Sequence, residues 1–234
     1  MPTADLLGDN AAEAGLTLST LPPVSRTSFT LADGQTVSAL AWGGAPPELV
    51  LLHGGGQNAH TWDTLALALG RPLLAVDLPG HGHSGRRQDR DYGPWRNAEA
   101  VALVSGPPVY ESFAAMAAAA VAASPNRRRS AVERGVRHNA RRLPDGRWTW
   151  RCDLFGDRPA AVADHAALWA DVSAITVPVL LVLGADSPFT RKEDVTKFRR
   201  RLPAARVEVV PGAGHAIQSD QPLALARLIE DFVS

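Results

Sequence analysis

Runs of apolar residues separated by short polar stretches recur along this chain and predict alternating strands and helices. Two such runs, over 48–52 and 71–77, have the length of strands and lack polar alternation, so we expect both to be buried on both faces. Apolar positions at helical spacing predict a helix between them, over about 59–69. A second pair of apolar runs near the C-terminus predicts strands over 177–184 and 205–210.

Turn signals and helical periodicity complete the predicted framework. Two β-rich runs at 27–31 and 35–42 flank Ala32-Asp33-Gly34, and Asp-Gly between such runs is a strong hairpin signal. Helices are predicted over 191–202 and over 222–233, the second of them amphipathic. Strands linked by helices favour an α/β fold, whose ligands bind at the carboxyl ends of the parallel strands.

The middle of the chain lacks this rhythm. Helices are predicted there over 92–99, over the Ala-rich stretch 109–123, over the basic stretch 127–142 and over 164–170, with an aromatic strand over 147–151. We therefore expect an α/β core formed by 25–106 and 173–234, a helical cap formed by 107–172, and an N-terminal arm over 1–24 that is loose or forms one marginal helix.

Charge and cysteine content narrow the functional classes. Lys+Arg and Asp+Glu both number 24, so the zero net charge gives no reason to expect nucleic acid or a membrane surface as partner, and the basic stretch is expected to be a solvated helix face. The single cysteine, Cys152, excludes a disulfide framework and fits a reducing cytoplasm. Neither a signal-peptide pattern nor an apolar run of membrane-spanning length is found, so we expect a soluble cytoplasmic protein of undetermined oligomeric state.

Three polar stretches at predicted strand ends carry candidate chemistry. His53-Gly54-Gly55-Gly56 is a loop whose backbone N–H groups are open to a developing negative charge, although a tight turn alone would explain the glycines. His215 follows a later strand and suits a general base near pH 7, or it is a plain surface-loop histidine. Asp186 suits the carboxylate that orients such a base, or it is a turn residue ahead of Pro188.

Together with the run Val76-Asp77-Leu78-Pro79-Gly80-His81-Gly82-His83-Ser84, these stretches resemble the motifs of the α/β-hydrolase superfamily, in that family's order, over about 25–234. The resemblance implies a mostly parallel sheet with helices on both faces and a cap. It also implies that His215 and Asp186 are catalytic and that Gly55 and Gly56 supply oxyanion donors. The substrate implied is a small ester, lactone or related acyl compound.

The nucleophile of that family is missing from the sequence. The family presents it as Gly-x-Ser-x-Gly, and this pattern does not occur. Near Ser84 the second glycine comes one place too early, and Pro107-Pro108 after Ser105 forbids the helix that must follow a nucleophile turn. Cys152 is better explained as a small apolar side chain. We therefore assign no nucleophile, and we expect the core to be shortened by an internal deletion of the strand and helix that normally carry it.

Two hypotheses of function follow. The first is a hydrolase with an incomplete triad, and the alternative is a catalytically inactive remnant, a pseudo-enzyme or binding scaffold of the same fold. The sequence shows neither metal-ligand spacing nor a dinucleotide-binding fingerprint, so no metal and no cofactor are expected. Aromatic residues of the expected cap suggest either a partly apolar substrate pocket or an ordinary core: Tyr110, Phe113, Trp148 and Trp150.

Overall fold

A computed structural model describes residues 3–31, 34–86, 109–124, 127–152 and 168–234. The chain divides into two compact units, Met1–Val162 and Ala163–Ser234, and each is described by itself. The helix expected over 92–99, the apolar run before Ser105 and Ser105 itself lie outside the described residues. The predicted boundaries of core and cap stay predictions.

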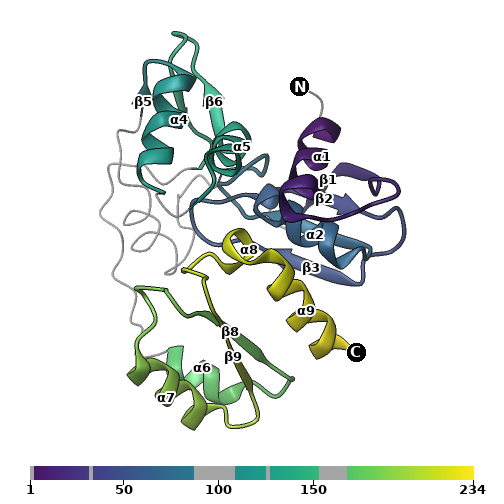
Figure 1. Ribbon diagram of the computed structural model, residues 1–234, viewed down its shortest axis with the longest axis vertical. Coiled ribbons are helices and arrows are strands. Elements are labelled where there is room, and N and C mark those ends of the chain that lie inside the picture. Colours follow the sequence, from purple (N-terminus) through teal and green to yellow (C-terminus); the bar gives the residue numbers. More distant parts are fainter. Residues whose placement is uncertain (1–2, 32–33, 87–108, 125–126, 153–167) are drawn as a thin grey trace. The chain divides into compact units, whose positions relative to one another are not determined.

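The first unit contains a four-stranded sheet in the order β1-β2-β4-β3 (Figure 1). β1 pairs antiparallel with β2, β2 antiparallel with β4, and β3 parallel with β4. The hairpin predicted around Asp33-Gly34 is thereby confirmed. The four strands are β1 (Val24–Thr30), β2 (Thr36–Trp42), β3 (Leu49–Leu52) and β4 (Leu73–Asp77).

The two apolar strands of this sheet differ in burial. β4 is central, and its alternate residues Leu73, Ala75 and Asp77 are almost fully buried, whereas β3 leaves Val50 60% and Leu52 58% exposed. The prediction that 48–52 is buried on both faces was therefore wrong. An apolar run predicts a strand, but it does not predict which other elements cover the two faces of that strand. Within the described residues, β3 pairs with β4 alone.

Three helical elements complete this part of the unit: α1 (Thr3–Ala14), the 3-10 helix η1 (Ala59–Trp62) and α2 (Asp63–Leu69). The N-terminal residues form the helix that the sequence left as one alternative. α1 contacts α2 and buries Leu6, Leu7 and Ala11. η1 begins directly after Asn58, whose side chain accepts a hydrogen bond from the His60 N–H, and this cap fixes the exit of the glycine loop.

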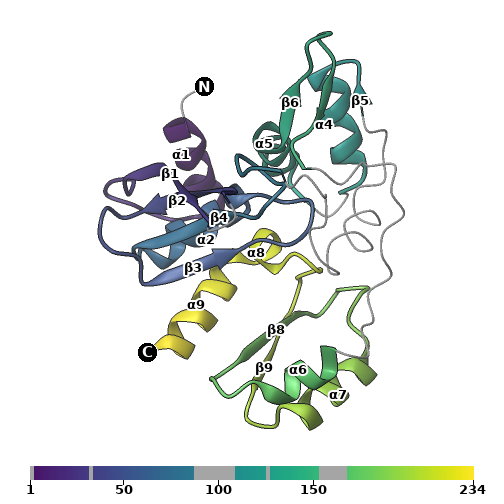
Figure 2. The same cartoon turned by 180° about the vertical axis from the view of Figure 1, so that it is seen from behind.

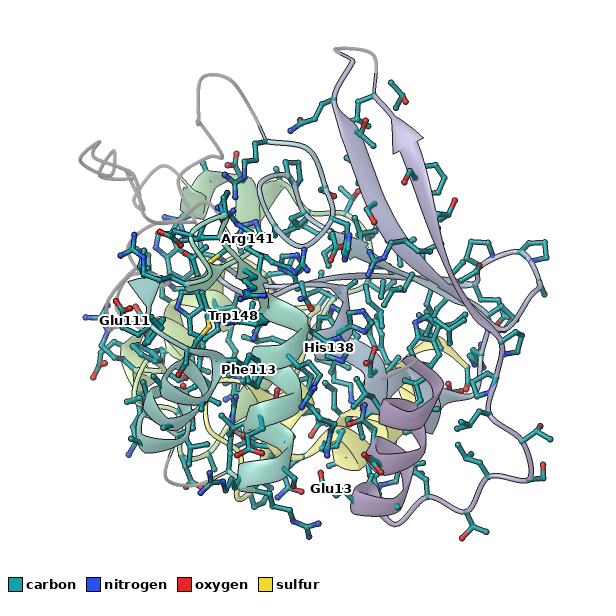
Figure 3. All side chains as sticks on the ribbon, turned by 90° about the horizontal axis from the view of Figure 1, so that it is seen from above. Glu13, Glu111, Phe113, His138, Arg141 and Trp148 are labelled. Atoms are coloured by element: carbon teal, nitrogen blue, oxygen red, sulfur yellow. The ribbon has the colours of Figure 1, made fainter. Side chains whose placement is uncertain are left out.

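Residues 109–124 and 127–152 contain both helices and strands (Figures 1 and 2), and the helix predicted over 109–123 begins only at Phe113. A three-stranded antiparallel sheet, in the order β5-β7-β6, accompanies two helices. The aromatic residues considered as pocket residues pack in this core, where Phe113 and Trp148 lie 5.2 Å apart between ring centroids (Figure 3). The elements are β5 (Val109–Tyr110), α4 (Phe113–Ala122), α5 (Arg129–Asn139), β6 (Ala140–Arg142) and β7 (Trp148–Trp150).

In the second unit, two parallel strands, β8 (Leu180–Gly184) and β9 (Arg206–Val210), confirm the C-terminal strand predictions. Val210, Ala213 and Ile217 form a small core that packs against α9, as the amphipathic pattern predicts. The helices are α6 (Leu168–Ala174), α7 (Lys192–Arg201), α8 (Ile217–Asp220) and α9 (Pro222–Val233). None of the helices in the described ranges has the length and apolar character needed to cross a bilayer.

Candidate active site

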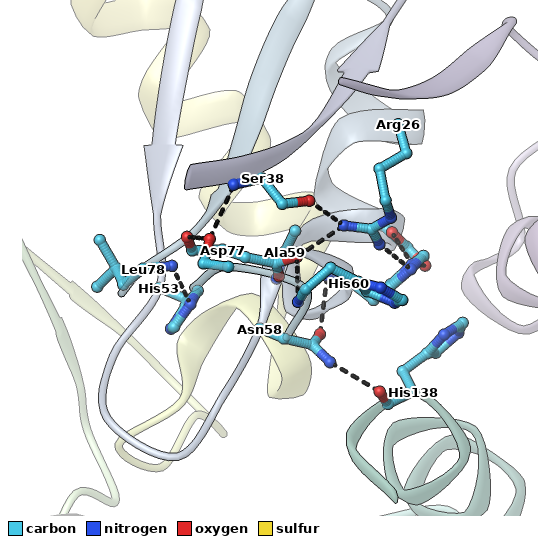
Figure 4. Close-up of polar contacts among 12 residues, drawn as sticks. Arg26, Ser38, His53, Asn58, Ala59, His60, Asp77, Leu78 and His138 are labelled. Carbon is cyan, nitrogen blue, oxygen red and sulfur yellow. Dashed lines mark hydrogen bonds and ion pairs between the residues drawn. The ribbon is translucent and has the colours of Figure 1, made fainter. Parts of the chain in front are cut away.

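A buried carboxylate at the end of β4 organises the loops of the first unit (Figure 4). Asp77 is 0% exposed, and its Oδ1 accepts a hydrogen bond from the Ala59 N–H at 2.8 Å. Its Oδ2 accepts from Arg26 Nη1 at 2.7 Å and from the His83 N–H at 3.1 Å. Burial alone would raise the pKa of this carboxyl, but the two amides and Arg26 outweigh it and lower the pKa. Asp77 therefore stays ionised and ties the start of η1 to the loop after β4.

The loop after β4 is built around this carboxylate. Gly82 has a φ of +52°, and a Cβ at this position would lie 2.3 Å from the Asp77 carboxylate, so only glycine fits. Ser84 donates from Oγ to the Asp77 carbonyl and accepts from the Ser38 N–H at 2.8 Å. The Ser84 hydroxyl is thus part of the loop structure, in line with the sequence argument against it as a nucleophile.

Two buried histidines fix the glycine loop between β3 and η1. His53 Nε2 accepts from the Leu78 N–H at 2.9 Å, so its Nδ1 carries the proton and donates to the Gly54 carbonyl at 2.7 Å. Burial lowers the pKa of His53 to about 4, which keeps this ring neutral. In the same way, His81 Nε2 accepts from the Gly56 N–H at 3.2 Å.

These bonds distinguish the two glycines predicted as oxyanion donors. The Gly56 amide is engaged by His81, and the Gly54 amide donates to Gln57 Oε1 at 3.2 Å. Within the described part of the chain, the Gly55 amide donates to no acceptor. The oxyanion role of Gly55 and Gly56 stays a prediction.

The predicted acid and base lie on adjacent loops of the second unit. Asp186 follows β8, His215 follows β9, and the Asp186 N–H donates to the Ala213 carbonyl at 2.9 Å. Both side chains are exposed, and among the described residues no hydrogen bond joins the Asp186 carboxylate to the His215 ring. The His215 ring packs edge-on against Phe189, with 5.0 Å between ring centroids. The structure thus brings the two loops together without closing the acid–base contact.

Two further residues hold the His215 loop in place. A Cβ on Gly184 would lie 1.9 Å from the Gly214 carbonyl oxygen, so a glycine at the end of β8 lets the loop approach. From the end of α8, Asp220 Oδ2 accepts a hydrogen bond from the Gly214 N–H at 2.9 Å. The sequence analysis missed the role of Asp220, because an acidic residue in a four-residue helix carries no signal of its own.

The sequence analysis also missed a cluster of His60, Asp63 and His138. The His60 and His138 rings stack with 3.8 Å between centroids and 14° between planes, and His60 Nδ1 donates to Asp63 Oδ2 at 3.0 Å. Burial, followed by the charges of His60 and Arg26, lowers the pKa of His138 to about 3. Burial also raises the pKa of Asp63. Folding of α5 onto η1 creates this cluster, so its members show no ligand spacing in the sequence.

Comparison with known proteins identifies related enzymes. The Esterase Rv0045c of Mycobacterium tuberculosis is 36% identical over an alignment of 287 positions that covers 96% of this chain and 93% of the relative. A shorter match, at 48% identity over 64 residues, links 26% of this chain to 25% of the pimeloyl-[acyl-carrier protein] methyl ester esterase of Aeromonas salmonicida.

Solved structures and a family model agree with these relatives. Two structures of the M. tuberculosis esterase, one described together with its inhibition by transition metals, superpose with TM-scores of 0.83 and 0.84 at 34% identity. Each superposition covers 100% of this chain, and it covers 99% of the first esterase structure and 98% of the second. The model of the alpha/beta hydrolase family matches residues 49–228, which include the glycine loop between β3 and η1 and the candidate acid and base. This chain is a member of the alpha/beta hydrolase family.

Proposed function

We propose that the protein is an esterase-type hydrolase that acts on a small carboxylic ester, lactone or related acyl compound. The observation that carries the proposal is the pairing of the Asp186 and His215 loops through the bond from the Asp186 N–H to the Ala213 carbonyl. This bond supports an acid and a base at neighbouring strand ends, as acyl transfer requires. The likeness to the esterase Rv0045c over nearly the whole chain supports the substrate class.

Each group has a distinct role in the proposed reaction. His215 takes a proton from the attacking group and returns it to the leaving alcohol, and Asp186 stabilises the imidazolium formed in between. The Gly55 amide donates to the oxygen that becomes negative at the acyl carbon. The substrate is the only partner required, without metal or cofactor. Cys152 is the single cysteine of the chain, so it has no partner within the chain for a disulfide, which supports a reducing compartment such as the cytoplasm.

The attacking group in this proposal is water, because no nucleophile is assigned. The alignment with Rv0045c spans 287 positions and this chain has 234 residues, so at least 53 positions of the alignment hold no residue of this chain. That difference supports the proposed loss of an internal segment. Without an acyl-enzyme step, turnover should be slow, since nucleophilic catalysis divides one difficult step into two easier ones.

A second candidate is a binding scaffold that keeps the fold without catalysis. It is favoured by the exposure of Asp186 and His215 and by the lack, among the described residues, of a hydrogen bond between their side chains. On this alternative the Gly55 amide binds the acceptor oxygen of a ligand that is never turned over.

Hydrolysis of p-nitrophenyl acetate and butyrate separates the two candidates. If His215 is the general base, we expect His215→Ala to lower the rate by roughly a hundredfold, within the range that general bases contribute. Asp186→Asn should lower it less, and Glu48→Ala, which removes an exposed side chain outside the proposed chemistry, serves as the control. Equal rates for the wild type and His215→Ala would establish the scaffold alternative.

A serine-reactive fluorophosphonate tests whether water is the attacking group. We expect the native protein to remain unlabelled, at the level of the heat-denatured control. Labelling that disappears in Ser105→Ala would identify Ser105 as the nucleophile and would replace water in the proposed mechanism.

A further inference from the structure

We propose that His60, Asp63 and His138 form a binding site for one divalent transition-metal ion, with Zn²⁺ the natural candidate. Each residue offers one ligand atom, and the three atoms all lie within 4.8 Å of one another. Two residues come from η1 and α2, and the third comes from α5, all in the first unit (Figure 4). The loops of Asp186 and His215 belong to the second unit.

The donor set selects the class of ion. Two imidazole nitrogens and one carboxylate oxygen suit zinc, cobalt, nickel or copper, whereas magnesium and calcium prefer oxygen ligands throughout. In a tetrahedral zinc site the ligand atoms stand about 3.4 Å apart, as follows from Zn–N distances near 2.1 Å. His60 Nδ1 and Asp63 Oδ2 stand 3.0 Å apart, so they would need to separate only slightly to reach this spacing. Rotation of the His138 side chain would bring in the third ligand.

His138 supplies an independent sign that a ligand is missing. Its Nε2 is buried and has no hydrogen-bond partner among the described residues. A buried polar atom without a partner is costly, and native structures seldom leave one unexplained. Figures 3 and 4 show His138 on the side of α5 that faces the first unit's sheet and η1. A metal ion bound between His138 and the His60–Asp63 pair would satisfy this atom.

The local charge balance also favours a cation. Two neighbouring arginines are each paired with another acid, Arg26 with Asp77 and Arg134 with Glu13. Asp63 is only 3% exposed, and within the described residues its one ion-pair partner is the His60 ring. A divalent ion bound here would place positive charge directly beside this buried carboxylate and would stabilise its ionised form.

Arg26 determines which ring nitrogen of His60 would bind the metal ion. Arg26 Nη2 contacts His60 Nε2 at 3.3 Å, so Nδ1, on the Asp63 side, is the metal-facing atom. When the ion replaces the Nδ1 proton, the ring carries its proton on Nε2 instead, and the long Arg26 contact has to open. Arg26 remains held through Nη1 by Asp77 and Ser38. This cost predicts micromolar rather than tighter affinity.

Cobalt titration of the untagged protein tests the site. We expect one equivalent of Co²⁺ to bind with the intense visible bands of four-coordinate cobalt, three ligands from the protein and one from water, and Zn²⁺ to displace it. His138→Ala and Asp63→Asn should each weaken binding at least tenfold. His215→Ala, which removes an exposed histidine of the other unit, should bind as the wild type does.

Each other result overturns the proposal. If Asp63→Asn and His138→Ala both bind cobalt as the wild type does, the ion binds at another site. The same conclusion follows if His215→Ala no longer binds it. If the wild type shows only the weak bands of octahedral cobalt, the ion is bound at the surface. This outcome is measured on the wild type, so it does not depend on whether a variant folds. Circular dichroism verifies that the near-isosteric Asp63→Asn variant is folded, and its melting temperature should lose the rise that Zn²⁺ gives the wild type.

Discussion

The Asp77 region of the first unit and the Asp186–His215 region of the second both lie at strand ends, yet they are held in different ways. Around Asp77, buried side chains accept and donate most of the bonds, and the loop histidines each have a fixed tautomer. Around His215, backbone contacts and Asp220 hold the loop while the reactive side chains remain exposed. Side-chain hydrogen bonds therefore fix the glycine loop, whereas among the described residues no hydrogen bond joins the Asp186 carboxylate to the His215 ring.

The largest effect is expected from removal of the buried carboxylate. Asp77→Ala leaves the Arg26 guanidinium and the amides of Ala59 and His83 without their acceptor. Breaking such a pair on one side should lower the free energy of unfolding by about 3–5 kcal/mol, measured by urea denaturation. The control is Glu48→Ala, which breaks the exposed ion pair with Arg71 and should cost at most about 1 kcal/mol. Similar losses in both variants would show that the Asp77 carboxylate stabilises the first unit no more than an exposed ion pair does.

Acid should weaken the first unit through His53. The pKa of this ring is lowered from 6.5 to about 4 in the folded protein. Between pH 6.5 and pH 4, His53 is therefore protonated in the unfolded chain but neutral in the folded one, so stability falls as the pH drops. The free energy of unfolding should fall by about 3 kcal/mol as the pH drops from 6.5 to 4, at 1.36 kcal/mol for each pKa unit. Urea titrations at several pH values measure this slope.

A variant of His53 isolates that contribution. Asn at this position offers both a donor and an acceptor but does not titrate in this range, so His53→Asn should show a shallower fall over the same pH window. A slope as steep as that of the wild type would mean that other groups cause the acid sensitivity.

A methyl group at the end of β8 should disturb the second unit. Gly184→Ala places its Cβ against the Gly214 carbonyl, a backbone atom that can move only with the His215 loop. We expect a loss of about 1–3 kcal/mol and a changed NMR shift of the His215 ring. Gly135→Ala, at an exposed position of helix α5 with nothing within 4 Å of the added carbon, should instead stabilise by up to about 1 kcal/mol. Equal behaviour of the two variants would argue against the close approach.

The smallest effect is expected at the anchor of the His215 loop. Asp220→Asn replaces a charged acceptor of the Gly214 N–H with a neutral one and should cost about 1 kcal/mol. Asp186→Asn, whose carboxylate is exposed, should change stability by less than about 0.5 kcal/mol. Denaturation curves of the two variants measure these two losses of stability. A larger loss for Asp186→Asn than for Asp220→Asn would mean that Asp220 does not stabilise the His215 loop.

Local patterns in the sequence were sufficient for much of the fold. The Asp-Gly hairpin, the amphipathic α9 and the aromatic β7 each follow from residues close together in the chain, and the structure has all three. The same holds for the glycine loop, because His53 and the glycines beside it must form a tight turn wherever the chain goes next.

Features that depend on distant partners could not be predicted. The basic helix predicted over 127–142 ends at Asn139 because Ala140 and Arg142 pair with β7 instead. Arg26 and Asp77 form their ion pair across 51 residues, and no local pattern marks it. Burial of β3 failed for a similar reason, since it depends on which layers cover the strand.

The exposed side of β3 has a consequence for work with the protein. Val50 and Leu52 lie on a strand that is hydrogen-bonded on one side among the described residues, so two molecules that collide there can join through both backbone and apolar contacts. The fraction of protein lost to aggregation on warming or storage should then rise with protein concentration. Refolding should likewise recover a larger fraction of the protein from dilute solutions than from concentrated ones.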